Sequence, residues 1–197
     1  MTQPSHTFNR SIYKSPKEFT SAMVDIVNHA CDLKSAARSH QIDRAFTEKI
    51  MLTVTQVNDC RYCSYGHTRA ALKEGIPEDE IARIAAGEFG QFPEEEAAAF
   101  LFGQHYAESG GNPDPQAWQR FVEYYGEDKA RQILAYIRMI MMGNLLGNTF
   151  DAFLNRITGR PAPNSSFFSE LSILTMTVLG TLPVSVIMTL RMVKPAL

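Results

Sequence analysis

The chain has 197 residues, of which 45% are hydrophobic, and a formal net charge of -2. This length is typical of one ordinary domain, which buries about 70% of the surface that its unfolded chain exposes. No run of Lys and Arg reaches the roughly 5–8 residues of a basic patch, so no nucleic-acid partner is expected. The first ten residues lack the apolar stretch of a secretory signal, and three cysteines do not suggest a secreted disulfide framework. We therefore expect a cytoplasmic protein.

Prolines followed by acidic residues mark the beginnings of helices, because proline suits the first helical turn and negative charge suits the N-terminus. The segments that begin at Pro77 and Pro93 show both features. No stretch alternates apolar and polar residues in the way that a β-strand does. The sequence therefore predicts an all-α fold with helices over 16–39, 43–57, 61–74, 78–87, 94–109, 115–125 and 128–157.

The last predicted helix carries apolar and then polar residues along nearly one face, at positions Ile133, Ile137, Ile140, Asn144, Asn148 and Asp151. One interpretation places the polar residues in a cavity or a subunit contact. The other, which we favour, is that Gly143 and Gly147 bend the helix and turn these residues to solvent. On an earlier helix, Cys31 is expected to be a small buried hydrophobe.

A boundary rich in glycine and proline near residue 160 suggests a helical domain over 1–160 and an apolar C-terminal appendage over 161–197. The appendage contains 20 consecutive residues without charge, 171–190, which is long enough to span a bilayer. Gly180 and Pro183 interrupt this run, however, and basic residues follow it. We favour two short helices packed on the domain or on a neighbouring subunit; membrane association through 171–190 is the alternative.

Glu48, Cys60, Cys63 and His67 form the pattern that indicates chemistry. The last three are spaced i, i+3 and i+7, so in one helix both sulfurs and the imidazole share a face. Asn58-Asp59 would supply the capping groups that begin this helix. The first turn of a helix lowers a thiol pKa from about 8.5 into the range of about 3.5–7.5. His67 can then take a thiol proton, and Glu48, on the preceding helix, can orient the histidine or relay the proton.

The pattern Glu-x11-Cys-x2-Cys-x3-His, followed by an alanine-rich helical continuation, resembles the AhpD-like alkylhydroperoxidases of the carboxymuconolactone decarboxylase superfamily. The resemblance is strong over residues 40–90 and loose over the other helices. It implies an AhpD-like helical bundle that assembles as a homo-oligomer, either a trimer or a hexamer. It also implies a reversible disulfide between Cys60 and Cys63, with Glu48 and His67 as a proton relay.

Decarboxylase members of the superfamily lack the cysteine pair, so the pair favours the peroxidase-like branch. The peroxidase pattern has a second histidine where this chain has Tyr62, so that part of the relay would fall to Tyr62 or to water. We expect Cys63 to attack a hydroperoxide and become a sulfenic acid, with which Cys60 then condenses. An external dithiol or redox protein would restore the thiols. Helix geometry alone does not decide which sulfur attacks, and a partner disulfide is an alternative substrate. No cofactor or bound metal is expected.

The pattern has three rival interpretations, one of which the sequence argues against. The same four side chains could bind zinc, although structural zinc sites usually take their ligands from separate elements. A thioredoxin-like motif is set aside, because no predicted strand precedes Cys60. The chain could also be a non-catalytic helical oligomer or binding module, associated with a membrane through its tail.

Overall fold

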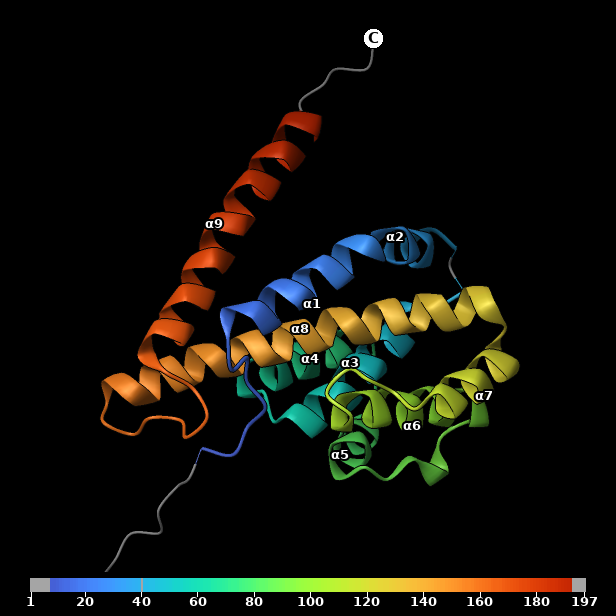
Figure 1. Cartoon of the computed structure of the whole chain (residues 1–197). Coiled ribbons are helices and arrows are strands. Elements are labelled where there is room, and N and C mark those ends of the chain that lie inside the picture. The colour runs from blue at the N-terminus through green and yellow to red at the C-terminus, as the bar shows by residue number, and fades with distance from the viewer. Residues whose placement is uncertain (1–7, 40, 193–197) are drawn as a thin grey trace, which may run out of the picture.

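The computed structural model describes residues 8–39 and 41–192, and for residues 181–192 only the course of the backbone (Figure 1). Within these residues all regular structure is helical, which confirms the predicted all-α fold. The elements in chain order are α1 (Pro16–Asn28), α2 (Ala30–Ser39), α3 (Arg44–Asn58), α4 (Arg61–Lys73), α5 (Glu78–Ala86), the 3-10 helix η1 (Phe89–Gln91), α6 (Glu94–Glu108), α7 (Pro115–Tyr125), α8 (Glu127–Ile157) and α9 (Phe167–Met192).

The predicted helix over 16–39 is divided into α1 and α2 at His29. The side chain of His29 turns back on the end of α1, where its Nδ1 lies 2.8 Å from the carbonyl oxygen of Asp25. Its backbone N–H also donates to this carbonyl. The ring thus adds a side-chain contact at the point where α1 ends.

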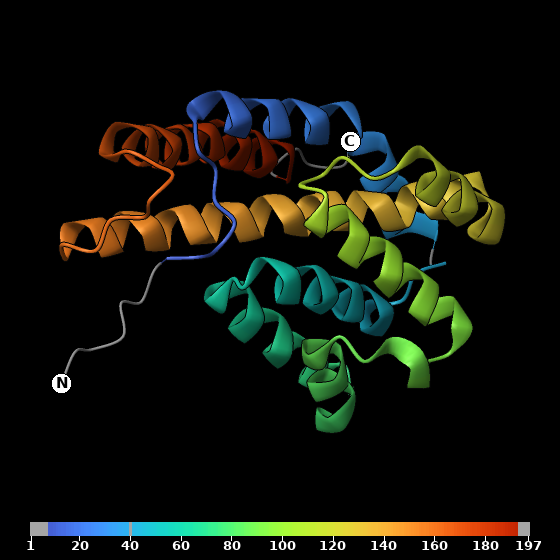
Figure 2. The ribbon, with the colours of Figure 1, turned by 60° about the horizontal axis from the view of Figure 1, so that its bottom comes forward.

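The long helix α8 runs through the middle of the molecule, with α1 and α9 on one side and α3, α4 and α6 on the other (Figure 2). The largest hydrophobic cluster lies where α3, α6 and α8 meet, around the buried side chains of Ile50, Val54, Phe100, Ile133 and Ile137. This arrangement leaves the centre of α8 without a face toward water.

The polar residues on α8 are therefore buried, and the interpretation that placed them in solvent is wrong. Asn144 and Asn148 have no exposed surface, and Asp151 is almost fully buried. Gly143 and Gly147 lie within the continuous helix α8. A buried polar side chain needs hydrogen-bonding partners. Asn148 and Asp151 find such partners near the cysteine pair.

The uncharged tail forms one helix. The prediction of two short helices, based on Gly180 and Pro183, is therefore wrong. An interior proline removes one backbone donor and costs about 3 kcal/mol, but it does not force a helix to end. Ile173 anchors the first half of α9 in a buried cluster with Tyr13 and Phe19. No helix within the described residues is long and apolar enough to cross a membrane. The division into 1–160 and 161–197 stays a prediction.

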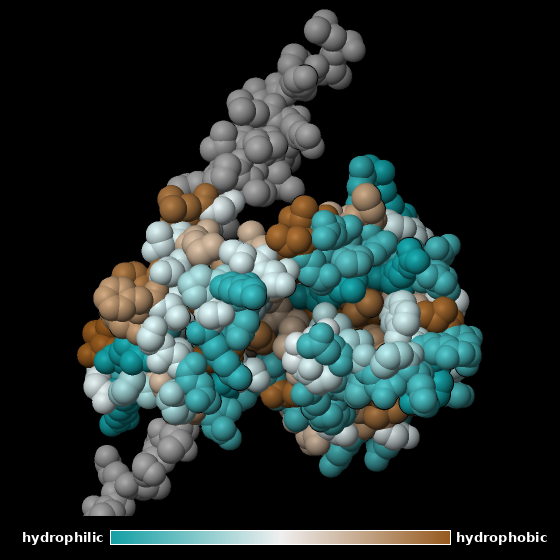
Figure 3. Space-filling view, viewed as in Figure 1, coloured by the Kyte–Doolittle hydropathy of each residue, from teal (hydrophilic) through white to brown (hydrophobic). Residues whose placement is uncertain are grey.

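A buried ion pair fixes the beginning of α9 to the end of α8. The carboxylate of Glu170, which has no exposed surface, accepts from Arg156 Nε at 2.8 Å and from Arg156 Nη2 at 2.9 Å. Apolar side chains are exposed around this junction, and brown residues gather there on the face shown in Figure 3. They include Leu154, Ile157, Phe167, Phe168 and Leu171; we call them the junction patch.

Candidate redox site

The turn between α3 and α4 places the cysteine pair. Asp59 has a left-handed backbone (φ 51°) and ends α3. Cys60 is itself the N-cap of α4, because its Sγ accepts a hydrogen bond from the backbone N–H of Cys63 at 3.3 Å. The expectation that Asn58-Asp59 would cap this helix is therefore wrong: Asn58 is the last residue of α3, and Asp59 turns the chain.

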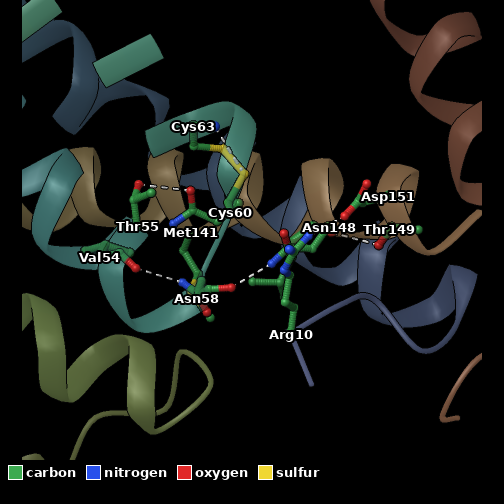
Figure 4. The surroundings of a disulfide bond; sticks show 12 residues. Arg10, Val54, Thr55, Asn58, Cys60, Cys63, Met141, Asn148, Thr149 and Asp151 are labelled. Carbon is green, nitrogen blue, oxygen red and sulfur yellow. Dashed lines mark hydrogen bonds and ion pairs between the residues drawn. A yellow bond between two sulfur atoms is a disulfide. The ribbon is translucent and has the colours of Figure 1, made fainter. Parts of the chain in front are cut away.

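Cys60 and Cys63 are joined by a disulfide, with their Cα atoms 5.3 Å apart (Figure 4). Their environments differ, since Cys60 has no exposed surface, whereas Cys63 is only partly buried. A reagent that approaches from outside therefore meets the sulfur of Cys63 first.

His67 and Glu48 lie together, as the spacing predicted. His67 Nδ1 is 2.7 Å from Glu48 Oε2, and both side chains are largely buried. An ionised carboxylate can only accept a hydrogen bond, so Nδ1 carries the hydrogen in this contact. That choice of tautomer leaves Nε2 free to take a proton.

Cys63, His67 and Glu48 line one pocket of about 690 Å³. Beyond these three residues the lining is almost entirely apolar or small, and it comes from α4, α8 and α9: Tyr62, Gly66, Ala70, Gly143, Leu146, Gly147, Phe150, Leu174, Thr177 and Val178. The structure thus brings together the four residues that the sequence singled out, with Cys60 behind Cys63. Their catalytic role stays a prediction.

Part of the chain is similar to known proteins. Residues 25–103 match the carboxymuconolactone decarboxylase family. The predicted resemblance to that superfamily is thereby confirmed, and its helical fold agrees with the helices seen here. The chain is also 29% identical over 116 residues to the uncharacterized protein YdfG of Bacillus subtilis (strain 168), an alignment that covers 57% of this chain and 78% of YdfG. No solved structure matches the chain significantly.

The carboxymuconolactone decarboxylase match contains all four motif residues but ends before α7, α8 and α9. Gly147, on α8, lies outside this match but next to the cysteine pair. A Cβ atom added there would lie 2.9 Å from Cys60 Sγ and 3.7 Å from Cys63 Sγ. Only glycine lets α8 pass this close to the disulfide, so Gly147 has a packing role that the sequence analysis missed.

Asn148 on α8 holds the turn that precedes the cysteines. Its Nδ2 donates to the carbonyl oxygen of Asn58 at 2.7 Å and to that of Ser11 at 3.0 Å (Figure 4). The Asn58 carbonyl belongs to the last turn of α3, where carbonyl groups have no partner within the helix. In the sequence, this contact was indicated only by the presence of an asparagine in the middle of a helix, after an apolar stripe.

Asp151, one turn beyond Gly147, ties the start of α4 to the segment before α1. Its buried carboxylate accepts from the guanidinium groups of both Arg61 and Arg10. Tyr62 also donates to Asp151 at 3.3 Å, and Arg61 donates to the Tyr62 hydroxyl at 2.8 Å. Tyr62 is therefore held by a charged network at the edge of the pocket.

Replacing Asp151 with alanine should lower the free energy of unfolding by about 2–4 kcal/mol, because two guanidinium groups would lose their shared carboxylate. Both arginines are partly exposed, which keeps the loss below that of a fully buried pair. Urea denaturation measures the effect. The control is Asp79→Ala, which removes an exposed i,i+4 pair with Arg83 and should cost about 0.5 kcal/mol or less. Equal losses in the two variants would contradict this account of Asp151.

One further expectation can be compared with the structure. Cys31 is exposed, so its interpretation as a buried hydrophobe is wrong. It lies on α2, whose buried face is formed by Ala36 instead. In the described part of the chain, no group of three or more His, Cys, Asp and Glu side chains is arranged to hold a metal ion.

Proposed function

We propose that this protein is a thiol-dependent peroxidase or disulfide oxidoreductase with Cys60 and Cys63 as its redox pair. The observation that carries the proposal is the shared pocket. Cys63 lines this pocket beside the His67–Glu48 pair, while Cys60 lies buried behind Cys63. The carboxymuconolactone decarboxylase match supports the proposal at the level of the superfamily.

The proposed oxidation begins with the reduced pair. His67 Nε2 takes the Cys63 proton, and the thiolate attacks the terminal oxygen of a hydroperoxide, ROOH. The O–O bond breaks, the sulfur keeps the OH group as a sulfenic acid, and RO⁻ leaves with the proton from His67 as ROH. Cys60 then attacks the Cys63 sulfur and water leaves. Two thiols and one peroxide thus become one disulfide, one alcohol and one water.

The pair is then reduced by an external dithiol or a redox protein. A thiolate of this reductant attacks the more accessible Cys63 sulfur, and Cys60 leaves as a thiolate. The backbone N–H of Cys63 already points at Cys60 Sγ, so the N-terminus of α4 can stabilise that negative charge. The second thiol of the reductant then releases Cys63. Disulfide exchange with a partner protein would use the same steps, which keeps a partner disulfide as an alternative substrate.

The proposal also includes a homo-oligomer, a trimer or a hexamer, in the cytoplasm and without a nucleic-acid partner. The junction patch supports the homo-oligomer, because contiguous exposed apolar side chains are typical of protein contacts. The alternative is a non-catalytic helical oligomer, associated with a membrane through its tail, and it predicts no peroxide-dependent change at the cysteines.

Mass spectrometry of the reduced protein, treated with one equivalent of a hydroperoxide, tests the proposal. The wild type should rapidly lose two hydrogens within one chain, with the bridge mapped to Cys60 and Cys63. The Cys60→Ser variant should stop at a sulfenic acid on Cys63, which a dione reagent traps. The Cys63→Ser variant should not react quickly. Cys31→Ser is the matched control and should behave as the wild type. Oxidation of the wild type by the hydroperoxide no faster than that of Cys63→Ser would refute the proposal.

A further inference from the structure

Helix α9 forms one wall of the pocket, although it lies outside the residues that match the family. Its contribution comes from Leu174, Thr177 and Val178, whose i, i+3 and i+4 spacing puts them on one helical face. We propose that this face of α9 determines substrate specificity by favouring hydroperoxides with a bulky, neutral, apolar group over hydrogen peroxide. This inference rests on the proposed peroxidase function.

The chemistry of the lining supports a neutral apolar substrate. The titratable groups that line the pocket are Glu48 and His67, which pair with each other, Tyr62, and Cys63 once the disulfide is reduced. Among the residues whose side chains the structure describes, no Lys or Arg lines the pocket to balance an anionic group. Leu146 and Phe150 of α8 add further apolar surface to the lining. An apolar substrate group bound in this pocket would be removed from water, which favours its binding. Hydrogen peroxide is too small and polar to be stabilised in this way.

The position of α9 is fixed by contacts away from the pocket. Its neighbouring face buries Ile173 against α1, and Glu170 joins it to Arg156 at the end of α8. Farther along, a Cβ on Gly180 would lie 3.9 Å from Met23 Cε, in ordinary contact with α1. Substitutions on the pocket face can therefore change the lining while the helix keeps its anchors.

Two adjacent residues of α9 provide a matched pair for a test. Val178 and Leu179 are 59% and 61% exposed, but only Val178 lines the pocket. The measured quantity is kcat/KM for cumene hydroperoxide divided by kcat/KM for hydrogen peroxide. In Val178→Gln this ratio should fall roughly three- to tenfold, the lower end of what one apolar contact contributes to selectivity. In Leu179→Gln it should equal the wild-type ratio. Equal ratios in all three proteins would overturn the inference.

A binding measurement separates this inference from the peroxidase proposal. Cumyl alcohol, the neutral product of cumene hydroperoxide, should slow alkylation of reduced Cys63 by iodoacetamide in the wild type and in Leu179→Gln. The protection should be several-fold weaker in Val178→Gln, while the exposed Cys31 serves as the internal reference in each protein. Protection without peroxide turnover would reject the peroxidase and retain the apolar wall. Turnover without protection would reject the apolar wall alone.

Discussion

Replacing His67 with glutamine should slow the peroxide-dependent oxidation of Cys63 by a factor of about 100 to 10,000. The variant loses the group that takes the thiol proton and returns it to the leaving alkoxide, and acid–base catalysis contributes about this much. The rate is measured by rapid quenching of the reduced protein and mass spectrometry. Glu48→Gln should cause a smaller loss, because an amide no longer fixes the histidine tautomer as the carboxylate does.

The pH dependence of this rate separates a proton-transfer role from a structural one. If His67 transfers the proton, its replacement with glutamine should alter the way in which the rate depends on pH. A purely structural role would lower the rate and leave that dependence unchanged. His29→Gln is the control, since His29 lies at the junction of α1 and α2 and pairs with Asp25. An unchanged rate in His67→Gln would remove His67 from the mechanism.

Replacing Gly147 with alanine should destabilise the oxidised protein by about 1–3 kcal/mol, which is the usual cost of an added carbon in a filled site. The new Cβ would lie 2.9 Å from Cys60 Sγ, and neither α8 nor the buried disulfide has room to move aside easily. The reduced protein should lose less, because its separate sulfurs can shift. Thermal or urea unfolding of both redox forms measures the difference.

Gly143→Ala provides the matched control on the same helix. Nothing lies within 4 Å of a Cβ at Gly143, so alanine there should be neutral or stabilise the helix by up to about 1 kcal/mol. If both glycine variants gained stability in the oxidised form, the close approach of α8 to the disulfide would not be a constraint.

Most of the fold could be predicted from local signals. Prolines and acidic residues at helix beginnings gave helix limits close to those observed, as at Pro77 and Pro93. The errors arose where tertiary contacts override local preference. Gly180 and Pro183 do not break α9, and the single predicted helix over 16–39 is divided at His29.

Cys60, Cys63 and His67 could be predicted to lie together because a helical period places them on neighbouring turns. Glu48 could be added because its helix directly precedes theirs along the chain. The rest of the site could not, since Gly147, Asn148 and Asp151 meet the cysteine turn across more than 80 positions of sequence. Their burial depends on the position of α8 between two layers, which is a property of the whole fold. Only the residue types pointed to a special role, because glycine and asparagine have low helix propensities and are unfavourable in the middle of a helix.

The bridged cysteines are separated by only three positions. Crosslinking so short a loop restricts the unfolded chain little and adds about 2 kcal/mol in the chain-entropy model, against roughly 3 kcal/mol for a 15-residue loop. The main hydrophobic cluster, built from helices α3, α6 and α8, does not depend on this covalent bond. The bond therefore adds little to the stability of the fold, and we expect the protein to stay folded when the bond is reduced.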